Sequence, residues 1–169
     1  MKRIIFIMLI LAAGVLIILQ VRIRTLTHTK EVMSAEEFTL QMEAKGYTVR
    51  DNDDVVNLFN AGTWLTAELG GFRVDFSVHR TTGDARLQYG GWRYFVRGRM
   101  DHTPRFGRRT YRERRGENFD KITGIYNRDP SRRNDSFHII VRVDNTILSI
   151  HTDIENRAAA EALLNTFGY

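Results

Sequence analysis

The pattern of hydrophobic and polar positions opens with an unbroken apolar run, residues 4–19, which contains no charged or polar side chain. At about 1.5 Å of rise per residue, a helix over this run is roughly 24 Å long. Val21 and Ile23 extend it to the ~30 Å hydrocarbon core of a bilayer, while Arg22 and Arg24 reach outward to the headgroups. The pattern therefore predicts a membrane-spanning helix, with residues 4–23 in contact with the membrane.

The same layout of a basic start and an apolar core also fits a cleavable secretory signal. In a signal, small residues at an A-x-A-like site follow the apolar core, whereas here Ala12, Ala13 and Gly14 lie inside it. The sequence contains no cysteine, which excludes lipoprotein processing. We therefore expect an uncleaved signal anchor over residues 1–24 and a short polar tether over residues 25–33, with a cleaved signal as the alternative.

Basic residues flank the apolar span on both sides, so the positive-inside rule is nearly balanced. Lys2 and Arg3 precede the span, and Arg22, Arg24 and Lys30 follow it. We expect a single-pass protein of the cell membrane with its N-terminus inside and its folded domain outside the cytoplasm.

Behind the tether, a helix over residues 35–45 is marked at both ends. Ser34 and Glu37 have the spacing of a capping box, in which each side chain accepts a hydrogen bond from the other residue's backbone N–H. Phe38 and Met42 share one face at i, i+4 spacing. Gly46 supplies the left-handed position that commonly follows a helix. These signals predict a helix with one apolar face.

Strands are predicted in the rest of the domain, and one of them shows strict alternation of apolar and polar residues. This strand is residues 72–79, where four apolar residues alternate with four polar ones. Gly70-Gly71 and Asp144-Asn145 suit the two-residue turns that join antiparallel strands into hairpins. The predicted strands are residues 47–50, 63–69, 72–79, 119–126, 137–143 and 146–151.

Two further helices are expected in the domain. Ala85, Tyr89, Trp92 and Val96 recur at helical spacing, although the pair Gly90-Gly91 costs about 1 kcal/mol for each glycine relative to alanine. Asp153 is expected to cap an alanine-rich last helix that ends at Gly168. Between them, residues 97–118 have little apolar periodicity and are expected to form a mobile loop.

These elements predict an α+β fold with an N-terminal transmembrane helix followed by one small domain, residues 34–169. Its length is that of a single domain. We expect an antiparallel sheet of about five or six strands packed by two or three helices.

Four stretches carry a resemblance: SAEEFTLQMEAKGYTV (34–49), FRVDFSVHRTTGDARLQY (72–89), VRVDNTILSI (141–150) and ALLNTFGY (162–169). Their order resembles a group of small uncharacterised membrane-anchored or lipoprotein domains common in Gram-positive bacteria. The resemblance implies a compact α+β domain held beside a membrane, and it brings no catalytic residues to carry over. The chain departs from the group in its Gly90-Gly91 pair and its arginine-rich stretch.

Positive charge is concentrated in the middle of the chain, where residues 86–115 contain ten arginines and two acidic residues. Guanidinium groups suit phosphate or carboxylate groups, and interleaved aromatic residues such as Phe106 and Tyr111 can stack on bases. Anionic lipid or a cell-envelope polymer is the favoured partner and nucleic acid a less favoured one, while a solvated loop explains the same residues without any ligand. The residues predicted to bind a polyanion are Arg105, Arg108, Arg109, Arg112, Arg114 and Arg115.

No motif predicts a catalytic residue, a cofactor or a metal site. The five histidines lack metal-ligand spacing, although His79, His138 and His151 approach one another if their strands pair. The acidic cluster Asp51, Asp53 and Asp54 lacks the glycine turn and distant glutamate of a calcium loop, and no phosphate loop or G-x-S-x-G motif is present. We expect a non-catalytic binding or accessory module; the alternative is an enzyme with a site assembled from scattered polar residues of the sheet.

Overall fold

A computed structural model of the chain describes residues 29–56, 61–101, 110–127 and 135–169. Within these ranges, no helix combines the length and the apolar character needed to cross a bilayer. The predicted anchor, residues 4–23, lies outside the described ranges and stays a prediction.

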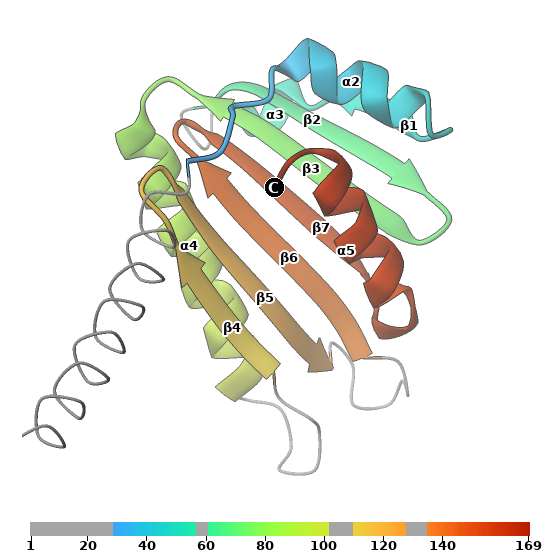
Figure 1. Cartoon of the computed structure of the whole chain (residues 1–169), viewed down its shortest axis with the longest axis vertical. Helices are drawn as coiled ribbons and strands as arrows, with labels where there is room; N and C mark the ends of the chain where they lie inside the picture. Colours follow the sequence, from blue (N-terminus) through green and yellow to red (C-terminus); the bar gives the residue numbers. More distant parts are fainter. Residues whose placement is uncertain (1–28, 57–60, 102–109, 128–134) are drawn as a thin grey trace, which may run out of the picture.

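The described part of the chain forms one α+β domain around a single antiparallel sheet of seven strands, in the order β1-β2-β3-β7-β6-β5-β4 (Figure 1). β3 pairs with β7, so strands from the two halves of the chain meet in the middle of the sheet. β1 and β4 are its edges. The strands are β1 (Thr48–Asp51), β2 (Ala61–Leu69), β3 (Phe72–His79), β4 (Thr110–Arg115), β5 (Phe119–Asn127), β6 (Asp135–Val143) and β7 (Thr146–Asp153).

Helices cover both faces of this sheet (Figure 1). α2 and α5 pack on one face, which we call the front face, and α4 packs on the other, the back face. A one-turn helix, α3, links β1 to β2, and a 3-10 turn, η1, precedes α5. The bounds are α2 (Ala35–Glu43), α3 (Asp53–Val56), α4 (Thr82–Asp101), η1 (Ile154–Asn156) and α5 (Arg157–Thr166).

Both predicted hairpin turns are confirmed. Gly70 and Gly71 have φ of 52° and 86°, which are the two positive values that the tightest hairpin turn requires. Asp144 has φ of 48° and is the one non-glycine residue of the described ranges with a positive φ. Asp and Asn tolerate this region better than other residues, so local turn chemistry explains the register of β6 against β7.

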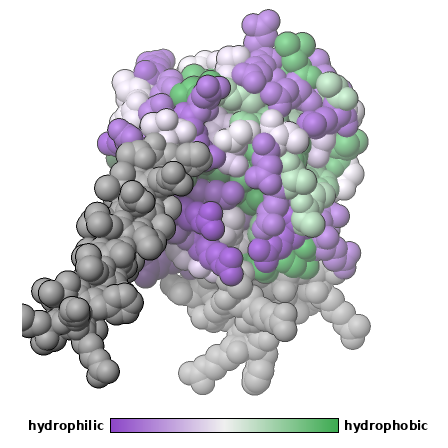
Figure 2. All heavy atoms as spheres, viewed as in Figure 1, coloured by the Kyte–Doolittle hydropathy of each residue, from purple (hydrophilic) through white to green (hydrophobic). Residues whose placement is uncertain are grey.

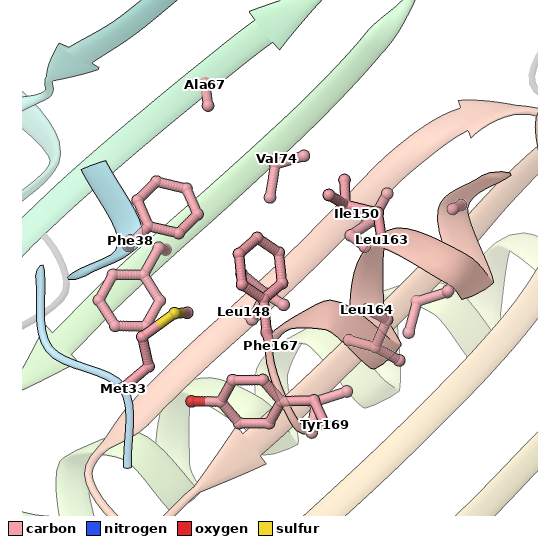
Figure 3. Close-up of a cluster of buried hydrophobic side chains, with 14 of the residues drawn as sticks. Met33, Phe38, Ala67, Val74, Leu148, Ile150, Leu163, Leu164, Phe167 and Tyr169 are labelled. Atoms are coloured by element: carbon pink, nitrogen blue, oxygen red, sulfur yellow. The ribbon is translucent and has the colours of Figure 1, made fainter. Parts of the chain in front are cut away.

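The front core is built around Phe38 of α2. Its ring is fully buried, stacks on Phe76 at a centroid distance of 4.9 Å and lies 6.1 Å from the ring of Phe167. Figure 3 shows side chains from α2, the sheet and α5 converging on this point. The chain ends beneath them at the buried Tyr169, whose hydroxyl lies 3.3 Å from Thr146 Oγ1.

Strand β6 contributes apolar side chains to both cores because helices cover both faces of the sheet. Phe137, Ile139 and Val141 belong to the front core, whereas Ile140 belongs to a smaller core under α4. This alternation follows from the two-residue period of a strand. The other buried residues of the back core are Ala85, Tyr89, Val96, Ile122 and Ile147.

The caps predicted at Ser34 and Gly46 are present, whereas Glu37 Oε1 accepts a hydrogen bond of 3.1 Å from Gln41 Nε2 instead of closing the predicted capping box. Ser34 Oγ accepts a hydrogen bond of 3.1 Å from Glu37 N, and the helix ends before Gly46, which has φ of 83°. Tyr47 N donates to Met42 O at 3.0 Å, which closes the last turn. Local capping therefore sets both ends of α2.

We expect Ser34→Ala to lower the free energy of unfolding by about 1 kcal/mol, because it leaves Glu37 N without its cap. Gly46→Val should lower the free energy of unfolding by about 1–2 kcal/mol, because valine is strained at the positive φ of this position. No steric clash adds to this penalty, since a Cβ at Gly46 meets nothing within 4 Å. Urea unfolding measures both. Gly46→Asn is the control and should cost less, because asparagine tolerates positive φ.

Three expectations need correction. The sheet has seven strands and not five or six, because residues 110–115 form β4. The prediction of a loop over residues 97–118 is wrong for residues 97–101, which belong to α4, and for residues 110–115, which form β4. Helix α4 is also continuous through Gly90-Gly91. The last helix, α5, begins at Arg157 because the 3-10 turn follows Asp153, whose side chain makes no cap hydrogen bond.

Candidate functional site: the edge strand β4

Strand β4 divides the arginine-rich run between the two faces of the sheet. Arg112 and Arg114 are exposed and lie opposite Thr123 and Lys121 of β5, on the front face. Arg115 lies opposite Asp120 and points with Glu113 to the back face. The remaining predicted polyanion ligands, Arg105, Arg108 and Arg109, lie outside the described residues. The described arginines therefore do not form one surface.

On the front face, four cationic residues gather at the β4 edge: Lys30, Arg112, Arg114 and Lys121. We call them the basic patch. Arg114 and Lys121 are direct cross-strand partners, and Lys30 Nζ lies 5.3 Å from the centre of the Phe119 ring, at the start of β5. In the space-filling view, hydrophilic side chains gather over the β4 and β5 part of this face (Figure 2).

The end of the tether is bound to the domain at Lys30. Its backbone N donates to Asn118 Oδ1 at 3.0 Å, and Asn118 Nδ2 donates back to Lys30 O at 2.8 Å. Lys30 Nζ donates to Gly168 O at 2.8 Å. These contacts join segments 88 and 138 residues apart, so the first described residues of the chain take a defined path beside the basic patch.

Positive charges in the basic patch are close enough to perturb one another. Partial burial lowers the pKa of Lys121, and the charges of Lys30 and Arg114 lower it further, while Glu161 acts in the opposite direction. Burial also lowers the pKa of Lys30. The protonated form of Lys121 is thus disfavoured by burial and by repulsion, and a bound anion would relieve the repulsion.

On the back face, the charges of β4 are paired. Glu113 lies 2.9 Å from Arg115 and 3.2 Å from Arg93 of α4, and it accepts a hydrogen bond from the Tyr111 hydroxyl. Burial acts against the ionisation of Glu113, but these cations and the Tyr111 bond outweigh it and hold the pKa of its carboxyl below the usual value.

The deeper ion pair of the back face joins β6 to β5. Arg142 Nε donates to Asp120 Oδ2 at 2.8 Å, and Nη1 donates to Asp144 O at 2.9 Å. The side chain of Arg142 is 3% exposed and that of Asp120 is 19% exposed. A buried guanidinium is stable only with such partners, so this pair is a structural element of the back face.

The histidines fall into two places on the sheet. His138 and His151 are cross-strand partners with ring centroids 4.2 Å apart, as expected if their strands pair. His79 lies elsewhere and its Nε2 is 3.0 Å from Ser77 Oγ. In the part of the chain that the structure describes, no group of three or more histidine or carboxylate residues is placed to hold a metal ion.

Sequence reasoning named Arg112, Arg114 and Arg115 but missed Lys30 and Lys121. No local signal marks these lysines, because they reach the edge of the sheet only through the pairing of β4 with β5 and the docking of the tether.

No protein-family model matches the chain, and no curated protein or solved structure matches it. The resemblance to small membrane-anchored domains stays a prediction.

Proposed function

We propose that the chain is a single-pass, membrane-anchored binding module that contacts anionic lipid through its basic patch, with the domain outside the cytoplasm. The observation that carries the proposal is the position of Lys30, which belongs both to the tether and to the patch. The first described residues of the chain thus lie at an edge of the sheet that carries cationic side chains.

The short tether keeps the basic patch near the headgroups. Five residues separate Arg24, at the end of the predicted span, from Lys30. The six fully extended Cα–Cα steps reach about 20 Å. A tether this short lets the patch approach the lipid surface to within one Debye length, about 8 Å at physiological salt, where an anionic membrane attracts basic side chains.

The expected attraction is useful but moderate. A basic residue close to an anionic membrane contributes about 1 kcal/mol. Arg112 and Arg114 are exposed and can each contribute at that level. Lys30 and Lys121 are partly buried, and Lys30 Nζ already donates to Gly168 O, so their contributions are smaller. A total attraction of this size is sufficient to orient a domain that is already anchored in the membrane.

Binding is favoured over catalysis by the state of the ionisable groups at the β4 edge. A general base needs a pKa near the working pH. Glu113 is held below its usual pKa and is engaged by two arginines and a tyrosine. The Glu113 carboxylate therefore does not supply the activated base that the competing hypothesis, an enzyme assembled from scattered polar residues, would need.

The anchor is tested first, with the full-length chain expressed in bacteria. We expect it to remain in the membrane fraction after high-salt and carbonate extraction, since residues 4–19 carry neither charge nor a following cleavage site. Protease added to intact spheroplasts should digest the domain. A soluble chain with a shortened N-terminus would show a cleaved signal, and full protection would place the domain inside.

The patch is tested by energy transfer in nanodiscs. The chain has no cysteine, so Glu31→Cys, an exposed position beside Lys30, places one fluorescent donor on the full-length chain. The acceptor is a lipid labelled on its headgroup. Transfer should be stronger with anionic than with zwitterionic lipid and should fall as salt rises, because the attraction is electrostatic.

Charge-matched variants separate the patch from the net charge. Arg112→Gln/Arg114→Gln/Lys121→Gln should abolish the dependence on anionic lipid. A control with the same change of charge at exposed positions elsewhere, Arg50→Gln/Arg80→Gln/Arg97→Gln, should keep most of it. Equal loss in both variants, or transfer indifferent to lipid charge, contradicts the proposal. Patch-dependent binding of a soluble polyphosphate alone would instead identify an envelope polymer.

A further inference from the structure

A cavity of about 350 Å³ lies on the back face, between α4 and the strands β4, β5 and β6. It is independent of the basic patch, which lies on the opposite face of the sheet. Its size is at the lower end of the range for small-molecule sites. The residues of the wall that matter here are Arg86, Tyr89, Gly90, Arg93, Arg115 and Arg142.

Tyr89 presents an unsatisfied donor in this wall. The residue is 5% exposed, and in the described part of the chain its buried hydroxyl has no hydrogen-bond partner. Burial raises the pKa of this phenol far above its usual value, and the charges of Asp120 and Glu113, which line the same cavity, raise it further. The hydroxyl therefore keeps its proton and requires an acceptor.

The net formal charge of the cavity lining favours an anion, and the arginines must supply the attraction because Asp120 and Glu113 are the leading charges acting on Tyr89. The four arginines of the lining exceed its three carboxylates, Glu113, Glu117 and Asp120, by one positive charge. Arg142 is almost fully buried, and its Nε and Nη1 are held by Asp120 and Asp144 O, which fixes the guanidinium plane. A fixed guanidinium that borders a cavity is suited to a planar or tetrahedral oxyanion.

Gly90 keeps the cavity open on the side of the helix. Glycine inside a helix is unfavourable relative to alanine, so its presence needs a reason. A Cβ at Gly90 would meet nothing within 4 Å, which means that a side chain there would extend into free space bordering the cavity. The adjacent Gly91 does not line the cavity, and nothing in the structure explains it.

We propose that this cavity binds a small molecule that carries one carboxylate or phosphate group. The oxyanion accepts hydrogen bonds from the Tyr89 hydroxyl and from the arginines of the wall, and the rest of the molecule occupies the opening beside Gly90. A water molecule would also accept the hydrogen bond of Tyr89. The proposal is therefore tested by whether the cavity binds charged molecules in preference to an uncharged one.

The test is isothermal titration of the full-length chain in a neutral detergent, at constant ionic strength. The probes are glucose 6-phosphate, glucuronate, inorganic phosphate and uncharged glucose. We expect heat of binding with the phosphate or the carboxylate sugar and none with glucose. The two sugars distinguish the kinds of anion, and inorganic phosphate shows whether the anion alone is sufficient. No heat with any anion overturns the proposal.

Tyr89→Phe removes only the hydroxyl. Because that hydroxyl is unpaired in the absence of ligand, the variant should melt at the same temperature as the parent or above it. Its anion affinity should be about tenfold lower or worse, since a hydrogen bond to a charged acceptor is lost. Tyr94→Phe, on the same helix but 81% exposed, is the matched control and should bind like the parent. Unchanged affinity in Tyr89→Phe contradicts the proposed role.

Neighbouring glycines supply a second matched pair. Gly90→Leu places a side chain at the cavity wall. Gly91→Leu adds the same side chain at the next residue of the helix, which does not line the cavity. Both should fold, because neither added Cβ meets another atom and leucine favours a helix. Only Gly90→Leu should abolish anion binding. Equal binding by the two variants places the ligand elsewhere, and the basic-patch variant should bind the anion normally.

Discussion

Phe38→Ala is expected to lower the free energy of unfolding by about 3–5 kcal/mol, which is a large share of the stability of a domain of this size. The ring is fully buried and is the point where α2 meets β3 and the end of the chain, through Phe76 and Phe167. Its removal leaves a cavity that rigid strands cannot close. Urea unfolding of the full-length chain in neutral detergent, followed by tryptophan fluorescence, measures the change.

Leu40→Ala on the same helix is the control for Phe38→Ala. Leu40 is 61% exposed, so this variant loses little burial and should unfold within about 0.5 kcal/mol of the parent. A small effect of Phe38→Ala, similar to that of Leu40→Ala, would mean that α2 is not packed on the sheet as described.

The second large effect is expected from Arg142→Met, at about 2–4 kcal/mol. Removing one member of a buried ion pair typically costs 3–5 kcal/mol, and the partial exposure of Asp120 reduces that penalty. The variant leaves the Asp120 carboxylate without its partner and removes the donor to Asp144 O. The same urea unfolding experiment measures the loss.

A double variant identifies the cause of that loss. Arg142→Met/Asp120→Leu removes both charges and should recover much of the stability, because apolar residues often replace a buried ion pair without net cost. If the double variant is less stable than Arg142→Met alone, the cost comes from lost packing or from Asp144 O and not from the unpaired carboxylate.

Local chemistry made much of the fold predictable. The turn at Gly70-Gly71 requires two positive φ values, which glycine adopts without strain, so the β2–β3 hairpin could be located from two residues. The caps Ser34 and Gly46 likewise mark α2 because each satisfies backbone groups within a few residues. Such signals need no knowledge of the rest of the chain.

Strand β4 escaped prediction for a physical reason. As an edge strand it carries charge on both faces, and charged edges prevent unwanted pairing between sheets. Arg112 and Arg114 face outward at the front, while Glu113 and Arg115 form ion pairs at the back. The apolar alternation that identifies a half-buried strand is therefore missing from residues 110–115, although their pairing with β5 is regular.

By itself the sequence determined the turns of two hairpins, the caps of α2, the α+β class and the concentration of positive charge in residues 86–115, because each depends on neighbours or on composition. Tertiary structure alone decided which way each charge points. Pairing of β4 with β5 sends Arg114 and Arg115 to opposite faces, and docking of the tether brings Lys30 to Lys121 and Gly168. The orphaned hydroxyl of Tyr89 also arises only when α4 covers the sheet. Contacts between residues far apart in the chain leave no periodic trace in the sequence, and both proposed sites are made of such contacts.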